Sequence, residues 1–94
     1  MNERYLIINA DDFGLCENMN QAICELFRLG AITSSSILSP APMAMNACQY
    51  AKEDSFPVGV HWTLFSEWKE ECWIPADKEK RGSSLTVNGL LPAD

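Results

Sequence analysis

Three segments of the chain have the apolar character of buried β-strands. They cover residues 4–10, 32–38 and 58–64. The first is nearly continuous in its apolar residues rather than alternating, which is typical of a strand buried on both faces of a parallel sheet. The second is rich in serine and threonine, and prolines follow it closely. We therefore expect three strands over these ranges.

The two segments between these strands have helical patterns. Apolar residues recur every three or four positions over residues 18–29, and Gly30 follows as a stop signal. Pro42 suits the first turn of a second helix, which Phe56-Pro57 would end. The packing face of this second helix carries only small side chains, namely Ala44, Ala47, Cys48 and Ala51. The order β-α-β-α-β with short connections predicts an α/β fold with parallel strands and right-handed crossovers.

The length of 94 residues and a hydrophobic fraction of 47% suit one globular domain. Residues 1–65 would form its βαβαβ core, and residues 66–94 a charged loop with Trp68 and Trp73. Residues 84–91 could add a small hairpin with an Asn88-Gly89 turn.

Charge and hydropathy exclude several kinds of partner. The net charge of −6 and the lack of a basic run argue against nucleic acid and anionic membranes. No apolar stretch approaches the length of about 20 residues that spans a bilayer. Residues 1–4 lack the features of a signal peptide, so we expect a cytoplasmic protein.

The four cysteines do not form a zinc-binding pattern. They stand at positions 16, 24, 48 and 72, without a Cys-x-x-Cys pair. Reduced thiols are expected for all four, with Cys24 and Cys48 as small core residues and Cys16 as a candidate thiol at the rim of a site.

The most distinctive chemistry lies at Asp11 and Asp12, directly after the first predicted strand. Active sites of α/β proteins lie at the carboxyl ends of their strands. Two adjacent carboxylates repel each other, and one pKa rises unless a cation or hydrogen-bond donors offset the repulsion. A divalent metal is the simplest positive partner, whereas a solvated turn is the alternative. Both side chains can face one site only if the chain bends between them, which Gly14 would permit.

His61 stands near the C-terminal end of the third predicted strand. In a parallel sheet this end lies at the same edge as the aspartates, so an imidazole and a carboxylate could meet there. Such ligands suit zinc, magnesium or manganese, and the ligand set does not choose among them. One aspartate would hold the metal while the other takes a proton from the attacking water. Hydrolysis of an amide or ester is the natural reaction class.

Three stretches of the sequence carry a resemblance to a known family. LIINADDFGLCENMNQAI, GAITSSSILSPAPMAMNACQYAK and VGVHWTLFSEW resemble the N-terminal portion of the YdjC-like carbohydrate deacetylases, and SSLTVNGLLP is similar to a later family segment. The resemblance covers nearly the whole chain. Its specific part is the combination of Asn-Ala-Asp-Asp-Phe-Gly with Gly-Val-His.

This resemblance implies a (βα) barrel-like fold of seven strands and metal-dependent removal of acetyl groups from amino sugars such as chito-oligosaccharides. It implies Asp12 and His61 as metal ligands, Asp11 as the catalytic base, and Mg²⁺ or Zn²⁺ as the metal. Family members run to roughly 250 residues, in the usual range for such barrels. The family's second metal-binding histidine has no counterpart here, because His61 is the only histidine. The chain is thus expected to be a single incomplete α/β domain.

Two other interpretations stay open. The chain could be an inactive fragment whose open sheet edge associates with copies of itself or with a missing C-terminal part. A receiver domain of a phosphorelay also has an Asp-Asp pair after its first strand, but it needs an aspartate where this chain has His61.

Tryptophan side chains suggest where a sugar could bind. Trp68 and Trp73 lie in the loop after the third strand, where aromatic faces could stack on sugar rings. The alternative is that both cover an apolar edge of the sheet, with Trp62 facing the core.

Overall fold

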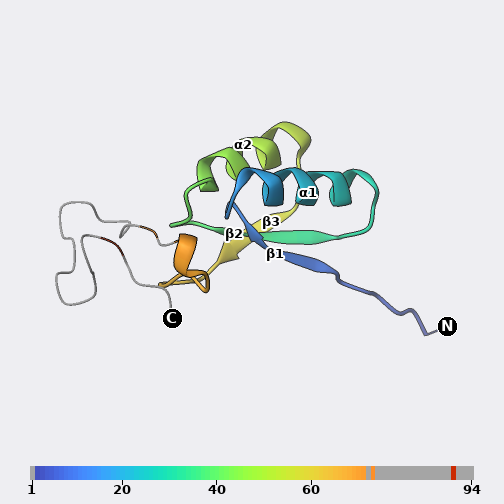
Figure 1. Cartoon of the computed structure of the whole chain (residues 1–94). Helices are drawn as coiled ribbons and strands as arrows, with labels where there is room; N and C mark the ends of the chain where they lie inside the picture. The colour runs from blue at the N-terminus through green and yellow to red at the C-terminus, as the bar shows by residue number, and fades with distance from the viewer. Residues whose placement is uncertain (1, 72, 74–89, 91–94) are drawn as a thin grey trace.

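The computed structural model describes residues 2–71, 73 and 90, in which strands and helices alternate (Figure 1). All three strands are parallel and follow the order β1-β2-β3 in one sheet. The predicted α/β fold with parallel strands is confirmed. The elements are β1 (Asn9–Phe13), α1 (Glu17–Arg28), β2 (Ser34–Leu38), α2 (Ala44–Asp54), β3 (Val58–His61) and the short 3-10 helix η1 (Lys69–Glu71).

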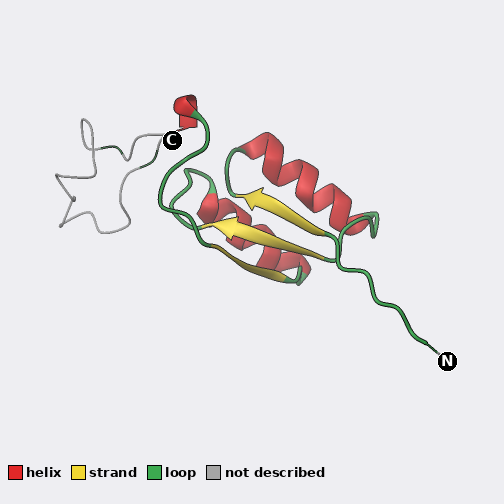
Figure 2. Ribbon diagram, turned by 90° about the horizontal axis from the view of Figure 1, so that it is seen from below, coloured by secondary structure: helices red, strands yellow, loops and turns green. Residues whose placement is uncertain are grey.

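Both helices cover the same face of the sheet, above the strands in Figure 1 and beside one another in Figure 2. The core between the two layers takes large side chains from the strands and α1 and only alanines from α2, so α2 lies close to the sheet. Its buried members are Phe13, Ile23, Cys24, Ile32, Ile37, Ala44, Ala47 and Ala51.

The end of α1 follows from Gly30, as predicted. Gly30 has a left-handed backbone with φ of 69°. Its N–H donates to Phe27 O, and the next N–H, from Ala31, donates to Leu26 O, both at 3.0 Å. This pair of bonds satisfies carbonyls that the helix leaves unpaired and turns the chain back toward β2.

The first strand differs from its prediction. It covers Asn9–Phe13 instead of residues 4–10, and the side chains of residues 5–8 are exposed rather than buried on both faces. The reason is pairing: β1 lies at the sheet edge, and the ladder with β2 begins only at Asn9 and Ser34. Before that point Ile8 is bonded to the start of β2: its O accepts from the N–H groups of Thr33 at 2.9 Å and Ser34 at 3.3 Å, and its N–H donates to Thr33 Oγ1 at 2.9 Å.

Three smaller predictions are also wrong. Pro42 precedes α2 in a turn closed by Ala44 N–H and Ala41 O at 3.2 Å. Cys48 is exposed, unlike the buried Cys24, because it faces a groove between α2 and β3 that no described residue fills. The third strand ends at His61 instead of residue 64. Trp62, just after it, is 93% exposed, which is against the alternative in which Trp62 faces the core.

A second, smaller core forms at the C-terminal end of β2. It consists of Leu15, Leu38, Ala41 and Trp73. The predicted hairpin of residues 84–91 and Cys72 lie outside the described residues, apart from Leu90. No helix in the described part of the chain has the length and apolar character needed to cross a membrane.

Candidate active site

A β-bulge shapes the end of β1. Ala10 pairs with Ser35 and Phe13 with Ile37, so three steps along β1 match two steps along β2. Ala10 and Phe13 both pack against the helix-side core, which leaves both aspartates off that face. Asp12 has a left-handed backbone with φ of 68°, a conformation that Asp adopts more readily than most residues. The bend expected between the two aspartates is present, and it lies at Asp12 itself.

The Asp12 carboxylate and the His61 imidazole meet at the C-terminal edge of the sheet. Asp12 Oδ1 lies 3.4 Å from His61 Nδ1, and the two side chains are 23% and 28% exposed. His61 Nδ1 is buried and has no hydrogen-bond partner among the residues that the structure describes. Buried polar atoms nearly always have a partner, so this nitrogen marks a place where a ligand could bind. The two predicted metal ligands are thus neighbours, and their role stays a prediction.

Electrostatics at Asp12 favour a cation. Partial burial raises the pKa of the Asp12 carboxyl above its ordinary value. His61 opposes this rise, whereas the carboxylates of Glu67 and Asp11 add to it. Burial therefore makes ionisation of Asp12 less favourable than in water, and a bound cation would offset that cost.

The spacing of Asp12 and His61 suits two ligands of one metal ion. Two atoms bonded at about 2.0–2.1 Å to a tetrahedral ion lie about 3.4 Å apart. Neighbouring ligands of an octahedral ion with similar bond lengths lie about 2.9 Å apart. The two atoms lie 3.4 Å apart, close enough to bind one ion. No group of three or more His, Cys, Asp or Glu side chains within the described ranges could hold a metal, so this pair would need further ligands.

Asp11 is held by polar side chains of β1 and β2. Its Oδ1 accepts hydrogen bonds from Asn9 Nδ2 at 2.8 Å and from Ser36 Oγ at 3.0 Å. Ser34 Oγ in turn donates to Asn9 Oδ1 at 2.8 Å. The hydrogen bonds described for this carboxylate all involve Oδ1, which leaves Oδ2 as the oxygen that could act on a substrate or water.

The two candidate sugar-binding tryptophans differ in exposure. Trp68 is 37% exposed, whereas Trp73 is 3% exposed and packs with Leu38. The Trp73 Nε1–H donates to Leu64 O at 3.2 Å. A buried indole has no free face for a sugar ring, so the packing of Trp73 favours the alternative that it covers the apolar end of the sheet. Stacking on Trp68 stays a prediction.

A buried asparagine ties the turn after β1 to the start of α2. Asn20 is fully buried, and its Oδ1 accepts a hydrogen bond from Gly14 N–H at 2.7 Å. Its Nδ2 donates to Met43 O at 3.1 Å and to Asn46 Oδ1 at 2.9 Å. Met43 N–H donates to Gly14 O at 2.9 Å. These bonds hold the segment that follows the two aspartates against α2.

We expect Gly14→Ala to lower the free energy of unfolding by about 2–4 kcal/mol. Gly14 has φ of 102°, and an added Cβ would lie 2.8 Å from the Cα of Ala44. Urea unfolding measures the loss. Gly30→Ala is the matched control, because Gly30 has φ of 69° but no atom within 4 Å of the added carbon. It should cost only about 1 kcal/mol. Equal losses at the two positions would contradict the close approach at Gly14.

The sequence did not predict the roles of four residues in this region. Asn9, Ser34 and Ser36 bond around Asp11, and Asn20 holds the turn after it. A signal existed for the first three. Polar residues at every second position of β1 and β2 indicate a polar sheet face. The interpretation of residues 4–10 as a strand buried on both faces did not take this alternation into account. Nothing in the sequence distinguished Asn20 from an exposed helix residue.

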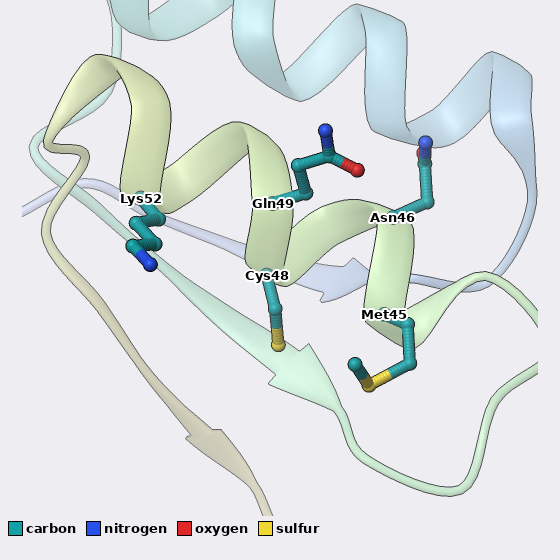
Figure 3. A pocket seen from close by; sticks show the side chains of 5 residues that line it. All are labelled: Met45, Asn46, Cys48, Gln49 and Lys52. Atoms are coloured by element: carbon teal, nitrogen blue, oxygen red, sulfur yellow. The ribbon is translucent and has the colours of Figure 1, made fainter.

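A surface hollow on α2 lies apart from this site (Figure 3). It is lined by Met45, Asn46, Cys48, Gln49 and Lys52, which all belong to α2. None of these side chains contributes to the contacts of Asp11, Asp12 or His61 described above. The predicted site residues therefore lie apart from this hollow, at the end of the sheet.

Comparison with known proteins identifies relatives of the chain. A model of the family described as YdjC-like protein matches residues 5–93. A carbohydrate deacetylase from Danio rerio is 40% identical over 80 residues, which are 85% of this chain and 24% of that protein. A chitooligosaccharide deacetylase from Yersinia enterocolitica is 40% identical over 63 residues, which are 66% of this chain and 25% of that protein. The chain thus spans about a quarter of the length of these relatives.

A solved structure shares the fold. It is a protein from Enterococcus faecalis named for cellobiose-phosphate cleavage, with a TM-score of 0.74 and 30% sequence identity. The match covers 94% of this chain and 33% of that one. The arrangement described here therefore recurs within a chain about three times as long.

Proposed function

We propose, since this chain belongs to the YdjC-like protein family, that it supplies the catalytic strands of a metal-dependent hydrolase. The reaction would remove acetyl groups from N-acetylated amino sugars of the chito-oligosaccharide type. The observation that carries the proposal is the 3.4 Å approach of Asp12 Oδ1 to His61 Nδ1, a buried nitrogen with no hydrogen-bond partner within residues 2–71, 73 and 90. The names of the relatives, carbohydrate and chitooligosaccharide deacetylases, support the reaction class.

Each site residue has a distinct role in this proposal. Asp12 and His61 would hold a divalent cation, Zn²⁺ or Mg²⁺. When bound, such an ion polarises the amide carbonyl as a Lewis acid. Asp11 is the general base: Oδ2 takes a proton from the attacking water and can later return it to the leaving nitrogen. Water then adds to the acetyl carbon, the C–N bond breaks, and acetate and a free amine result.

The substrate would approach across the C-terminal edge of the sheet, where Asp11, Asp12 and His61 lie. Trp68 stands in the loop that follows this edge and keeps part of its indole exposed. We place it as a stacking residue for a sugar ring next to the one that reacts. Trp68→Ala should then raise KM and leave kcat nearly unchanged.

The direct test is acetate release from N-acetylated chito-oligosaccharides by the full natural polypeptide that carries this chain. Activity should disappear on treatment with a chelator and return on addition of Zn²⁺ or Mg²⁺. Activity that survives complete metal removal would contradict metal dependence. Cleavage of glycosidic bonds without acetate release would contradict the deacetylase reaction.

A second candidate function concerns association through the outer strand. β3 pairs only with β2 among the described residues, and Val60, Trp62 and Leu64 next to its free edge are 75%, 93% and 52% exposed. Exposed apolar edge strands favour pairing with another chain. The 94-residue chain could thus be an inactive unit that binds a copy of itself or the remaining part of a barrel.

We expect the isolated 94-residue chain to self-associate in sedimentation velocity, with a sedimentation coefficient that rises with concentration. Val60→Lys should shift it toward monomer, because a lysine on an edge strand opposes strand pairing. Glu25→Gln, at an exposed position of α1, is a control that should leave association unchanged. A chain that stays monomeric at all concentrations would contradict this second function.

A further inference from the structure

The polar sheet face beside Asp11 contains a hydrogen-bonded chain of side chains from two strands. It joins Ser34, Asn9, Ser36 and Asp11 through contacts of 2.8–3.3 Å. These residues alternate with Ala10, Ser35 and Ile37 on the opposite, helix-covered side. None of the four belongs to either hydrophobic cluster.

The hydrogen bonds among these four side chains run in one direction, from donor to acceptor, and end at the Asp11 carboxylate. Ser34 Oγ–H donates to Asn9 Oδ1 at 2.8 Å, which fixes the orientation of the amide. Asn9 Nδ2 then donates to Asp11 Oδ1 at 2.8 Å and to Ser36 Oγ at 3.3 Å. With its oxygen accepting from Asn9, Ser36 directs its own hydrogen to Asp11 Oδ1 at 3.0 Å. Two donors thus hold one carboxylate oxygen and leave the other unrestrained.

These residues are not part of the hydrophobic core. Asn and Asp are depleted in β-strands, so their presence at paired positions of β1 lowers its intrinsic strand propensity. The large buried side chains of the sheet lie on the helix-covered side. A polar arrangement that adds little to folding, yet places two donors on a proposed catalytic base, is better explained by control of that base.

We propose that Asn9 and Ser36 are positioning residues that hold Asp11 with Oδ1 bound and Oδ2 turned toward the substrate, while Ser34 orients Asn9. This inference rests on the proposed function of Asp11 as general base. Hydrogen bonds to an ionised carboxylate are stronger than neutral ones, so two of them can fix the rotamer of a partly exposed side chain. A misplaced catalytic group loses much of its rate advantage even when it is still present.

The test uses the full natural polypeptide. Ser36→Ala and Asn9→Ala should each lower kcat for acetate release about 10- to 100-fold. KM, cation affinity and the midpoint of thermal unfolding should stay close to the starting values. Ser36→Thr, which keeps the hydroxyl, should restore most of the rate. Gln21→Ala, at an exposed position of α1, should behave like the unsubstituted protein.

A crystal structure of the Ser36→Ala variant supplies a readout independent of activity. The Asp11 carboxylate should rotate away from residue 36 of β2, to which it is hydrogen-bonded in the unsubstituted protein. An unmoved carboxylate, or a kcat within about twofold of the starting value, would overturn the positioning role. If that occurs while Asp11→Asn is inactive, the proposed function stands and only this inference fails. If Asp11→Asn itself is fully active, both fail.

Discussion

Asp11→Asn is expected to lower acetate release by the natural polypeptide about 10²- to 10⁴-fold, the range for loss of a general base. Asn keeps the size of Asp and can still accept the hydrogen bonds of Asn9 and Ser36 through its carbonyl oxygen. It cannot take a proton from water at neutral pH. Cation affinity should change little, because in this proposal the ligands are Asp12 and His61. Steady-state assays and calorimetric titration of Zn²⁺ measure the two effects.

The control for Asp11→Asn is Asp54→Asn. Asp54 accepts a hydrogen bond from Arg28 at 2.7 Å on the helix layer, so the same chemical change occurs outside the site. It should leave the rate within about twofold, since surface substitutions rarely alter stability by more than about 0.5 kcal/mol. An Asp11→Asn protein that hydrolyses at the normal rate would show that another group acts as the base.

His61→Ala and Asp12→Asn should each weaken cation binding at least about 100-fold. The loss of an outer partner of a metal ligand already costs 10- to 100-fold in affinity, and the loss of a ligand costs more. Asn is the suitable replacement for Asp12, because φ of 68° there would strain an alanine but is tolerated by Asn. The resulting change in affinity then reports the carboxylate and not a distorted bulge.

Asp11→Asn serves as the reference variant in the same titrations. It removes an adjacent negative charge but no proposed ligand, so its affinity should fall only slightly. Unchanged affinity in both His61→Ala and Asp12→Asn would place the cation elsewhere in the polypeptide.

The sequence was sufficient to predict the order of elements. Apolar runs and helical spacing indicated each strand and helix, and Gly30 marked the end of α1. The exception at β1 has a physical cause: residues 4–10 have the composition of a strand buried on both faces, but burial requires neighbours. β2 offers a partner only from Ser34 onward, and none of the described residues covers the other edge of β1.

The site was predictable only in part. The position of His61 at the same sheet edge as the aspartates followed from parallel strands alone. The bulge could not be predicted in the same way. Gly14 indicated a bend after the two aspartates, but Asp12 itself also adopts a left-handed conformation. The Asn9 and Ser36 contacts with Asp11 depend on the bulge that shifts the register between Ala10 and Phe13, and no residue pattern in the sequence marks that bulge.

The central claim is that one cation lies between the end of β1 and the end of β3. Crystals of the natural polypeptide grown with Zn²⁺ and measured on both sides of the zinc absorption edge test it directly. We expect an anomalous peak within bonding distance of both Asp12 and His61 Nδ1. A zinc peak bound at other residues, with these two side chains apart from it, would contradict the account.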